Sequence, residues 1–430
     1  MRIGNRLKLS LDFRRVWYTA LLFVFLYMPP VTSINIKYLI GIAGWIYLIF
    51  HRCAFPRKIW ITITAIGILS VYILFAGFLN THTILNTMAS KMYLAVFVFP
   101  YAMMLGNIAS ERHYSQEDLI KMLGWAAFIE SLFSAAAYMD YEIQTFLLNL
   151  MSFSTDNELV QYMKEWRMYG MADGMTYAMP ILQGIIGIIL LLYALHREIS
   201  YIIFVPFICL SGLINARTTI VVLLAGILFI LISCHFLKLK TMKRAAAVGM
   251  FALAGMFIFS RFQQGKTNTQ WLQDGFREIL AFLSGKLEGY FYIVFQDENV
   301  ASRFLKLPAG WGLLFGNGSI PPSDIGYIRD IWAGGILMAA VLYGIYAMML
   351  KQIYVYASMH VSEKIARNAI VFLAIVLFAV NVKGEICCIN EVSNLVVFLY
   401  VTAGIKCSRE GRYGTVSVRN TNVYRAVRGV

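Results

Sequence analysis

The feature that most constrains this chain is a succession of apolar runs, several short but most long enough for a helix to cross the hydrocarbon layer of a bilayer. They lie at about 17–32, 36–50, 59–79, 92–109, 121–139, 175–195, 200–216, 218–237, 245–260, 331–350, 367–382 and 393–405. Of the 430 residues, 59% are hydrophobic and only 14% charged, which is more apolar side chain than a water-soluble globule buries. Because a bilayer offers no partner to backbone polar groups, we expect these runs to be helical. The pattern predicts an all-α integral membrane protein with about twelve transmembrane helices.

The formal charge of +14 is distributed as an orientation signal. If the basic N-terminus faces the cytoplasm, the cytoplasmic connections and both tails hold 24 of the 37 Lys and Arg residues. Positive residues near transmembrane segments are retained on the cytoplasmic side. We therefore predict that the basic tails, 1–15 and 406–430, are both cytoplasmic, and that the charge does not indicate a nucleic-acid partner.

The connections on the opposite side define the rest of the expected organisation. We predict one polytopic membrane domain, 1–430, with two larger extracytoplasmic loops at about 140–174 and 261–330. Apolar residues recur at helical spacing between 159 and 166, and again over roughly 274–295. This periodicity is typical of amphipathic helices that lie on a membrane surface. Each loop is therefore expected to carry an interfacial helix.

The stretch 307–335 is the densest cluster of glycine, proline, charge and aromatic residues in the chain. Its glycines at 310, 312, 316 and 318 allow backbone conformations with positive φ and a close approach to a ligand. Polar groups follow directly before the apolar run that begins at Ile331: Asp324, Tyr327, Arg329 and Asp330. Polar groups held against a bilayer are costly to dehydrate, so they indicate a site. The alternative is a glycine-rich hairpin that returns the chain to the membrane.

Two further ionisable residues stand out by position. Glu130 is the only carboxylate well inside an apolar run, and such a residue is a functional candidate by default. The alternative is a protonated Glu130 that hydrogen-bonds to another helix. Arg217 lies between two apolar runs, at a helix start, where it can bind an anion or extend to lipid phosphate.

Several familiar constellations are missing from the sequence. There is no Walker loop, no Rossmann glycine pattern after a strand, no Gly-x-Ser-x-Gly elbow and no His-Glu-x-x-His. No Cys/His group has zinc spacing, so we predict no metal and no cofactor. Outward-facing arginines, glycine-bearing loops and an aspartate suit an anionic, lipid-linked substrate. Guanidinium groups bind a diphosphate bidentately and stabilise it as a leaving group.

Three stretches of the sequence resemble one family. They are Asn215-Ala-Arg217-Thr-Thr219, Trp166-Arg167…Gly170, and Gly316-Asn-Gly318…Ser323-Asp-Ile-Gly-Tyr-Ile-Arg-Asp330…Gly334-Gly335. Together with the architecture of the whole chain, they resemble the Wzy-type O-antigen, capsular and exopolysaccharide polymerases. The resemblance implies a membrane-embedded glycosyltransferase of the bacterial cytoplasmic (inner) membrane. It would transfer an undecaprenyl-diphosphate-linked glycan onto the next undecaprenyl-diphosphate-linked repeat unit at the outer face, without a metal.

The resemblance also implies roles for particular residues. Residues expected to hold the donor diphosphate are Arg167, Arg217, Arg303 and Arg329. Asp324 would act with Arg217 in catalysis, orienting or deprotonating the acceptor hydroxyl. Residues expected to bind the acceptor and its sugars are Trp311, Tyr327, Lys383 and Glu385. For each arginine except Arg217, a lipid or intraloop contact is an equal alternative, and Asp324 can instead cap a turn.

The expected partners are undecaprenyl-diphosphate-linked oligosaccharide, membrane lipids and a chain-length regulator protein. Two related activities are alternatives. O-antigen ligases carry a histidine in the long loop, whereas all six histidines here lie outside it, which favours a polymerase. A lipid-linked oligosaccharide flippase would show internal repeats and charge at the bilayer midplane. Here the polar residues concentrate in the outer loops, which favours surface chemistry over transport. A non-catalytic membrane scaffold is also compatible with the sequence.

Overall fold

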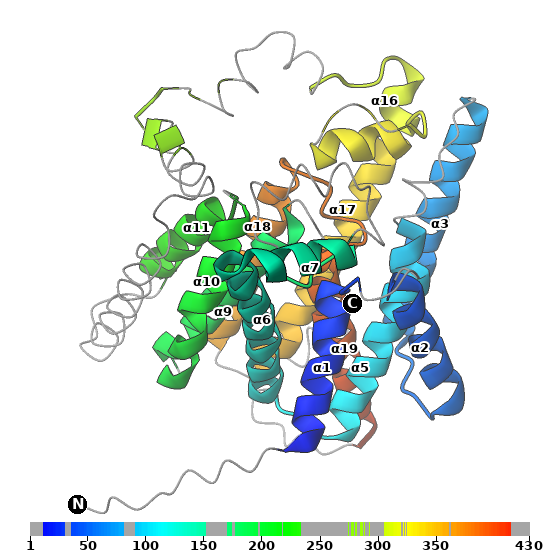
Figure 1. Cartoon of the computed structure of the whole chain (residues 1–430). Helices are drawn as coiled ribbons and strands as arrows, with labels where there is room; N and C mark the ends of the chain where they lie inside the picture. Colours follow the sequence, from blue (N-terminus) through cyan, green and yellow to red (C-terminus); the bar gives the residue numbers. More distant parts are fainter. Residues whose placement is uncertain are drawn as a thin grey trace, which may run out of the picture.

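The fold is described from a computed structural model. It describes residues 12–30, 36–80, 91–151, 170–173, 177–196, 198–216, 218–233, 305–319, 321, 323, 325–360 and 363–413, with isolated positions between 274 and 292. Within these residues all regular structure is helical, as the apolar runs predict. The elements form an upright bundle, with α7 lying across the ends of α1 and α6 (Figure 1).

The helices follow the predicted runs along the chain. In the first half they are α1 (Phe13–Tyr27), α2 (Ile36–Phe50), α3 (Arg57–Leu79), η1 (Leu94–Val98), α5 (Phe99–Glu111), α6 (Gln116–Met139) and α7 (Tyr141–Met151). In the second half they are α9 (Ala178–His196), η2 (Ile199–Ile203), α10 (Phe204–Asn215), α11 (Thr218–Ser233), α16 (Trp311–Phe315), α17 (Gly326–His360), α18 (Glu363–Val380) and α19 (Glu391–Tyr413).

Five of the helices are long and apolar enough to cross a membrane. They are Arg57–Leu79, Lys91–Glu111, Gln116–Met139, Ala178–Leu195 and Gly326–His360. Shorter apolar helices coincide with four further predicted runs: Ile36–Phe50, Ser200–Asn215, Thr218–Leu231 and Ile365–Val380. The predicted run at 245–260 lies outside the described residues. The all-helical membrane class is thus supported, and the number of twelve spans stays a prediction.

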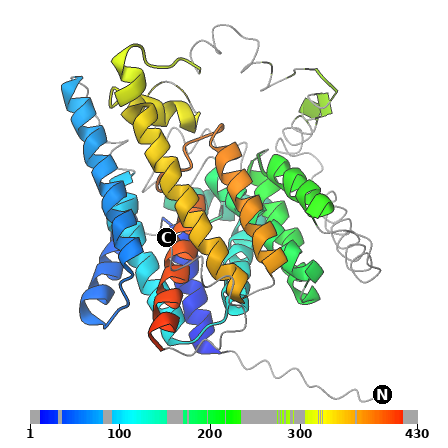
Figure 2. The same ribbon diagram turned by 180° about the vertical axis from the view of Figure 1, so that it is seen from behind.

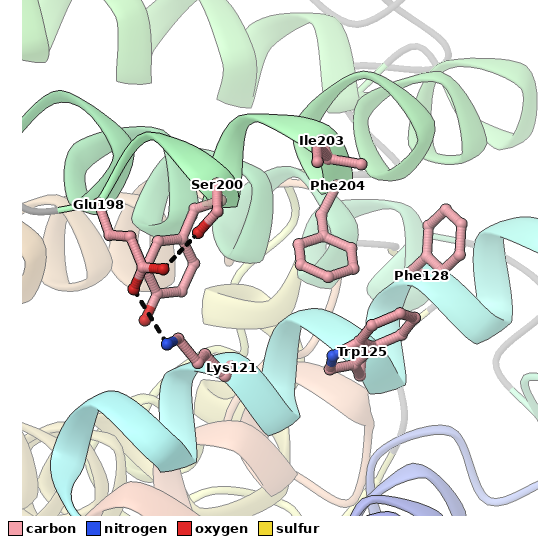
Figure 3. A pocket seen from close by; sticks show the side chains of 8 residues that line it. Lys121, Trp125, Phe128, Glu198, Ser200, Ile203 and Phe204 are labelled. Carbon is pink, nitrogen blue, oxygen red and sulfur yellow. Dashed lines mark hydrogen bonds and ion pairs between the residues drawn. The ribbon is translucent and has the colours of Figure 1, made fainter. Parts of the chain in front are cut away.

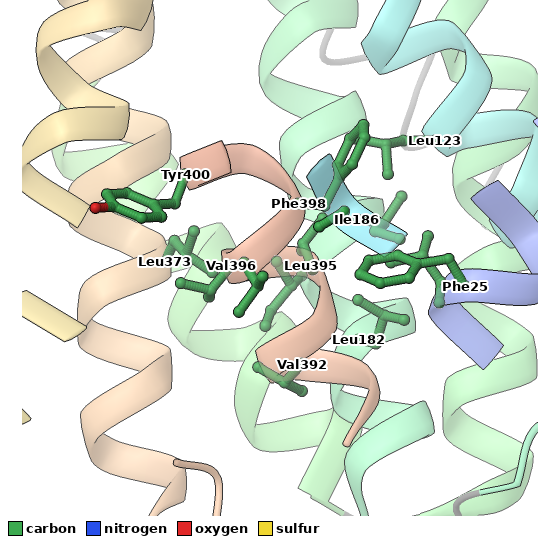
Figure 4. Packing of buried hydrophobic residues seen from close by; sticks show 14 of the residues in the cluster. Phe25, Leu123, Leu182, Ile186, Leu373, Val392, Leu395, Val396, Phe398 and Tyr400 are labelled. Atoms are coloured by element: carbon green, nitrogen blue, oxygen red, sulfur yellow. The ribbon is translucent and has the colours of Figure 1, made fainter. Parts of the chain in front are cut away.

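Helix α19 forms the centre of the bundle, in contact with α1, α5, α9 and α17. Its residues Leu395 and Phe398 are fully buried, and Figure 4 shows them gathered with Phe25 and Ile186. Small residues let neighbouring helices approach closely, as is usual in membrane bundles. At Gly44 of α2, for example, an added Cβ would lie 2.5 Å from the Tyr101 backbone nitrogen of α5.

The described connections between the upright helices lie at two ends of the bundle (Figure 1). At one end, the Ala54 backbone N–H donates to Asn107 Oδ1 (2.8 Å), and Arg409 pairs with Glu111 (3.1 Å). We call this the 112–115 end, after the connection between α5 and α6. We call the opposite end the 381–390 end, after the connection between α18 and α19. There the Asp173 backbone N–H donates to the Tyr27 carbonyl (2.9 Å).

The glycine-rich stretch packs against the start of α17 at the 381–390 end, as Figures 1 and 2 show for α16. Gly335 interrupts α17 with φ 76° and ψ 176°, a region that only glycine adopts readily. The interruption leaves carbonyls of the preceding turn available. Those of Trp332 and Ala333 accept from the Asn317 and Gly318 backbone N–H groups, at 2.8 and 3.0 Å. The break in the helix therefore anchors the stretch that precedes it.

The predicted extracytoplasmic loops are described only in part. In the first, α7 covers Tyr141–Met151, while the expected interfacial helix near 159–166 lies outside the described residues. In the second, the described residues between 274 and 292 are isolated positions, so the expected helix over 274–295 also stays a prediction.

Candidate functional site

The most unusual feature at the 381–390 end is a buried ionic cluster of three side chains. Lys91 is 0% exposed, and its Nζ lies 3.0 Å from Asp330 Oδ1. The same ammonium group donates a hydrogen bond to Glu385 Oε1. Three separate parts of the chain contribute: the start of the helix Lys91–Glu111, the first turns of α17, and the connection after α18.

A hydrogen-bond network orients the carboxylate of Asp330. Tyr343, on the same helix, donates its hydroxyl proton to Asp330 Oδ2 at 2.6 Å. The hydroxyl of Tyr343 in turn accepts from Asn381 Nδ2 at 3.0 Å. The side-chain oxygen of Asn381 also accepts from the Ile386 backbone N–H (2.9 Å), and its backbone carbonyl accepts from the Gly326 N–H (2.8 Å). The side chain of Asn381 thus ties the connection to the ionic cluster.

Arg329 brings a second cation to the edge of this cluster. Its Nε lies 3.8 Å from Glu385 Oε2, too far for a good hydrogen bond, and makes none to any described residue. The arginine side chain is 31% exposed, whereas Glu385 is nearly buried. The Glu385 carbonyl is fixed by the Tyr177 hydroxyl, at 2.9 Å. The guanidinium group therefore retains donors for a further acceptor.

Electrostatics explains why these charges occur together. Each isolated charge would cost several kcal/mol to bury, and oppositely charged partners with good geometry offset that cost. Two cations, Lys91 and Arg329, balance two carboxylates, Asp330 and Glu385. Asp330 also lies near the N-terminus of α17, where the helix dipole favours a negative charge. Lys91 has no such support from its own helix, so its partners determine its position.

A π-helical turn, Leu94–Val98, begins three residues after Lys91. Such turns are rare and are frequently found at functional sites. The turn belongs to the same continuous helical segment as Lys91, which runs on to Glu111. The irregular backbone thus lies one turn away from the buried ammonium group.

The structure brings together some of the residues predicted to act. Arg329 and Glu385 form one cluster, and Lys383 lies two residues before Glu385 in the same connection. Tyr327 donates its hydroxyl proton to the Phe378 carbonyl, and its ring packs edge-on against Tyr343 with centroids 5.2 Å apart. It lies beside the cluster with its hydroxyl already occupied.

Trp311 lies apart from these residues on the short helix α16. Its side chain is 77% exposed, and its ring stacks near Phe315 with ring centroids 6.0 Å apart. Its predicted role in sugar binding stays a prediction, and within the described part of the chain no hydrogen bond or ring contact joins it to the ionic cluster. The other predicted site residues lie outside the described residues: Arg167, Arg217, Arg303 and Asp324.

Sequence reasoning did not assign three members of the site. Lys91 lies in the connection between the predicted apolar runs 59–79 and 92–109, and it is fully buried at a helix start. Asp330 was noted beside an apolar run without a role, and Tyr343 lies inside that run. One feature of the sequence could have indicated Lys91 and Asp330. Each directly precedes a long apolar run, where a charge without an oppositely charged partner would be costly.

Glu130 has a different environment from the ionic cluster. It is fully buried in α6, and its two carboxyl oxygens each lie 3.1 Å from the Met171 backbone nitrogen, which donates to them. The partner is therefore the segment 170–173 rather than another helix. An added Cβ at Gly170 would collide with this carboxyl group, so the close contact requires glycine. Glu130 holds a connection onto the bundle.

Two cysteines complete the surroundings of the cluster. The thiol of Cys388 donates to the Glu385 carbonyl at 3.0 Å, and burial raises its pKa to about 12. Burial also raises the pKa of the Cys387 thiol. Both side chains are therefore neutral thiols at neutral pH. Among the described residues, no group of three His, Cys, Asp or Glu side chains is arranged to hold a metal ion.

Comparisons with protein-family models, with curated proteins and with solved structures find no match to this chain. The site therefore has to be interpreted from its own residues. Its arrangement can hold an anion at Arg329 and a hydroxyl group at Glu385, next to buried charges that keep both side chains in place.

Proposed function

We propose that the protein is a polysaccharide polymerase of the cytoplasmic membrane. It transfers an undecaprenyl-diphosphate-linked glycan onto the next undecaprenyl-diphosphate-linked repeat unit. The observation that carries the proposal is the partly exposed Arg329, held by Glu385 at the rim of the buried Lys91 cluster. This is a fixed cation at the end of the bundle that carries the longest predicted loops.

In this proposal the donor diphosphate binds to Arg329. A guanidinium group offers several N–H donors in a plane that matches two phosphate oxygens. The acceptor hydroxyl attacks the anomeric carbon, the bond from that carbon to the diphosphate breaks, and undecaprenyl diphosphate leaves with the negative charge. Arg329 stabilises that charge as it develops. Removing a group that stabilises developing charge usually causes a large loss of reaction rate.

The remaining groups position the reactants. Lys91 pairs with both Glu385 and Asp330, and so keeps the Glu385 carboxylate beside Arg329 instead of in solvent. Asp324 stays the proposed base for the acceptor proton, six residues before Asp330 in the same stretch. The exposed indole of Trp311 offers a flat apolar face of the kind on which sugar rings pack.

A direct test is polymerisation by the purified protein. The full chain in detergent receives undecaprenyl-diphosphate-linked repeat units, without nucleotide sugar or metal, and the products are separated on a gel. We expect a ladder spaced by one repeat. Arg329→Ala should slow ladder formation by roughly 10²–10³-fold, as loss of a donor to a developing charge does.

The matched control is Arg277→Ala. Arg277 is also predicted to be extracytoplasmic, but its side chain is 72% exposed and pairs with Asp274 at 3.3 Å, outside the ionic cluster. It should retain the normal rate. Equal activity of Arg329→Ala and Arg277→Ala in equally folded protein would exclude Arg329 from the reaction.

A lipid-linked oligosaccharide flippase is the second candidate, and one observation favours it. Transporters often combine interrupted helices with buried charge, and here Gly335 interrupts α17 five residues after the buried Asp330. In proteoliposomes a flippase would move the same lipid between leaflets without lengthening its glycan. Movement without a ladder would replace the polymerase proposal.

A further inference from the structure

A pocket of about 330 Å³ opens on the bundle surface at the 112–115 end, away from the ionic cluster. Pockets that hold small ligands usually measure about 300–1,000 Å³. Its walls come from α6, from Glu198 and the short helix η2 that follows it, and from the start of α10 (Figure 3). The helical segment Lys91–Glu111 has 21 residues, so roughly 30 Å separate this end from the ionic cluster.

One side of the pocket presents a charge of each sign. Lys121 Nζ lies 3.0 Å from Glu198 Oε2, and the two side chains are 42% and 48% exposed. Ser200 donates its hydroxyl proton to the other Glu198 oxygen at 2.7 Å, as the dashed lines in Figure 3 show. These two contacts lower the pKa of Glu198, so the carboxylate is charged at neutral pH. Both charges are accessible to an incoming group.

The ring of Tyr201 also lines the pocket. Tyr201 is only 2% exposed, and its hydroxyl lies beneath the surface, out of reach of a ligand. The Lys121 ammonium group lies 5.7 Å from the centre of this ring. A ligand oxygen in the pocket would therefore meet a charged donor that is held beside an aromatic ring.

The opposite side of the pocket is aromatic. The rings of Trp125 and Phe204 pack edge-on with centroids 4.8 Å apart, and Phe128 packs against Phe204 at 5.6 Å. Trp125 remains 49% exposed on the outer surface of the bundle. Tryptophan is enriched where the lipid headgroups meet the hydrocarbon. The pocket thus joins an apolar wall to a polar mouth.

We propose that this pocket binds a glycerophospholipid whose headgroup carries a phosphate and a primary ammonium, that is, a phosphatidylethanolamine. The phosphate accepts from Lys121. The ammonium donates to Glu198, and an acyl chain lies along Trp125 and Phe204. A zwitterionic headgroup matches a pocket that presents both signs of charge, whereas an anionic headgroup without an ammonium would leave Glu198 facing negative charge.

The test measures lipid binding by the full-length, delipidated protein in detergent. Dioleoyl phosphatidylethanolamine, phosphatidylcholine and phosphatidylglycerol are each titrated, and binding is followed by native mass spectrometry and by the rise in melting temperature. We expect phosphatidylethanolamine to bind at least tenfold more tightly than the other two. Lys121→Gln should weaken its binding severalfold, and Lys121→Gln with Glu198→Gln at least tenfold.

The control is Arg409→Gln, which breaks an exposed ion pair of similar length to Glu111 at the same end. It should leave lipid affinity unchanged. The lipid-free melting temperature of each variant shows whether it folds, and Lys121→Gln alone keeps the test possible if the double variant does not fold. Equal binding of phosphatidylcholine would refute the contact with Glu198. Tighter binding of phosphatidylglycerol, or normal affinity in the Lys121→Gln and double variants, would overturn the proposal.

Discussion

At the scale of single residues, the buried charge of Lys91 should dominate the stability of the 381–390 end. Lys91→Met leaves the carboxylates of Asp330 and Glu385 buried without their shared cation. Removing one partner of a buried ion pair typically costs about 3–5 kcal/mol. We expect a loss of that size, measured by unfolding of the purified protein in mixed micelles.

Two further variants separate charge from packing at this position. Adding Asp330→Asn to Lys91→Met removes one of the two unpaired carboxylates and should recover part of the stability. Lys306→Met changes an exposed lysine at the same end and should be neutral. If Lys91→Met were as stable as Lys306→Met, the ionic cluster would not contribute to the fold.

Cys388 allows a prediction about pH. Its side chain is partly exposed, yet burial raises the pKa of its thiol to about 12. The thiolate is the nucleophile, and with that pKa only roughly one thiol in ten thousand is ionised at pH 8. Maleimide should therefore modify Cys388 at least a hundredfold more slowly in the folded protein than in denaturing detergent, as peptide mass spectrometry can follow.

The sign of the linkage follows from the same shift. Because the folded pKa lies above that of an unfolded thiol, about 8.5, ionisation favours the unfolded chain, and stability declines as the pH rises above that value. The folded-state labelling rate should rise about tenfold per pH unit between pH 7 and 10. A rate that levelled off near pH 9 would contradict a raised pKa.

At the scale of elements, the interruption of α17 can be tested with two glycines of the same helix. Gly335 has φ 76° and ψ 176°, and an added Cβ would collide with the backbone of Leu314. Residues other than glycine cost about 1–3 kcal/mol in that region of φ and ψ. Gly335→Ala should therefore lower the free energy of unfolding by at least that amount.

Gly344 is the matched control, nine residues further along α17. Its environment leaves open space around an added Cβ. Because alanine is about 1 kcal/mol better than glycine inside a helix, Gly344→Ala should be neutral or stabilising. Opposite signs for the two substitutions, in denaturation of purified protein, would confirm that α17 is interrupted at Gly335. A stabilising Gly335→Ala would show a continuous helix instead.

The helices were largely predictable from sequence, and the site was not, for a physical reason. An apolar run defines a helix because backbone groups in lipid need local partners, and that requirement acts within one segment. The meeting of Lys91, Asp330 and Glu385 depends on which helices become neighbours, and hydropathy carries no such information. Arg329 and Glu385 were predicted as separate contributors, because 56 residues of sequence separate them. Lys91, which pairs with Glu385 and with Asp330 next to Arg329, lies more than 200 residues away from each of them.

At the scale of the whole molecule, the two ends of the bundle carry different chemistry. The 381–390 end holds the ionic cluster and the glycine-rich stretch, and the 112–115 end holds the pocket beside Lys121. The predicted orientation places the first end outside the cell and the second in the cytoplasm. A lipid-linked glycan displayed on the outer leaflet reaches Arg329 only in that orientation, so the proposed function and the topology stand together.

Orientation can be tested with single cysteines in a variant that lacks the native ones. Leu307 is 47% exposed near the ionic cluster, and Phe55 is 39% exposed near the opposite end. A membrane-impermeant maleimide added to intact cells should label Leu307→Cys and not Phe55→Cys. After lysis both should react, which shows that each thiol is accessible. The reverse pattern would place the ionic cluster in the cytoplasm, away from a glycan assembled outside, and would rule out polymerisation at the outer face. Because retained positive charge determines orientation, removing the basic N-terminal residues should weaken the labelling difference in the same assay.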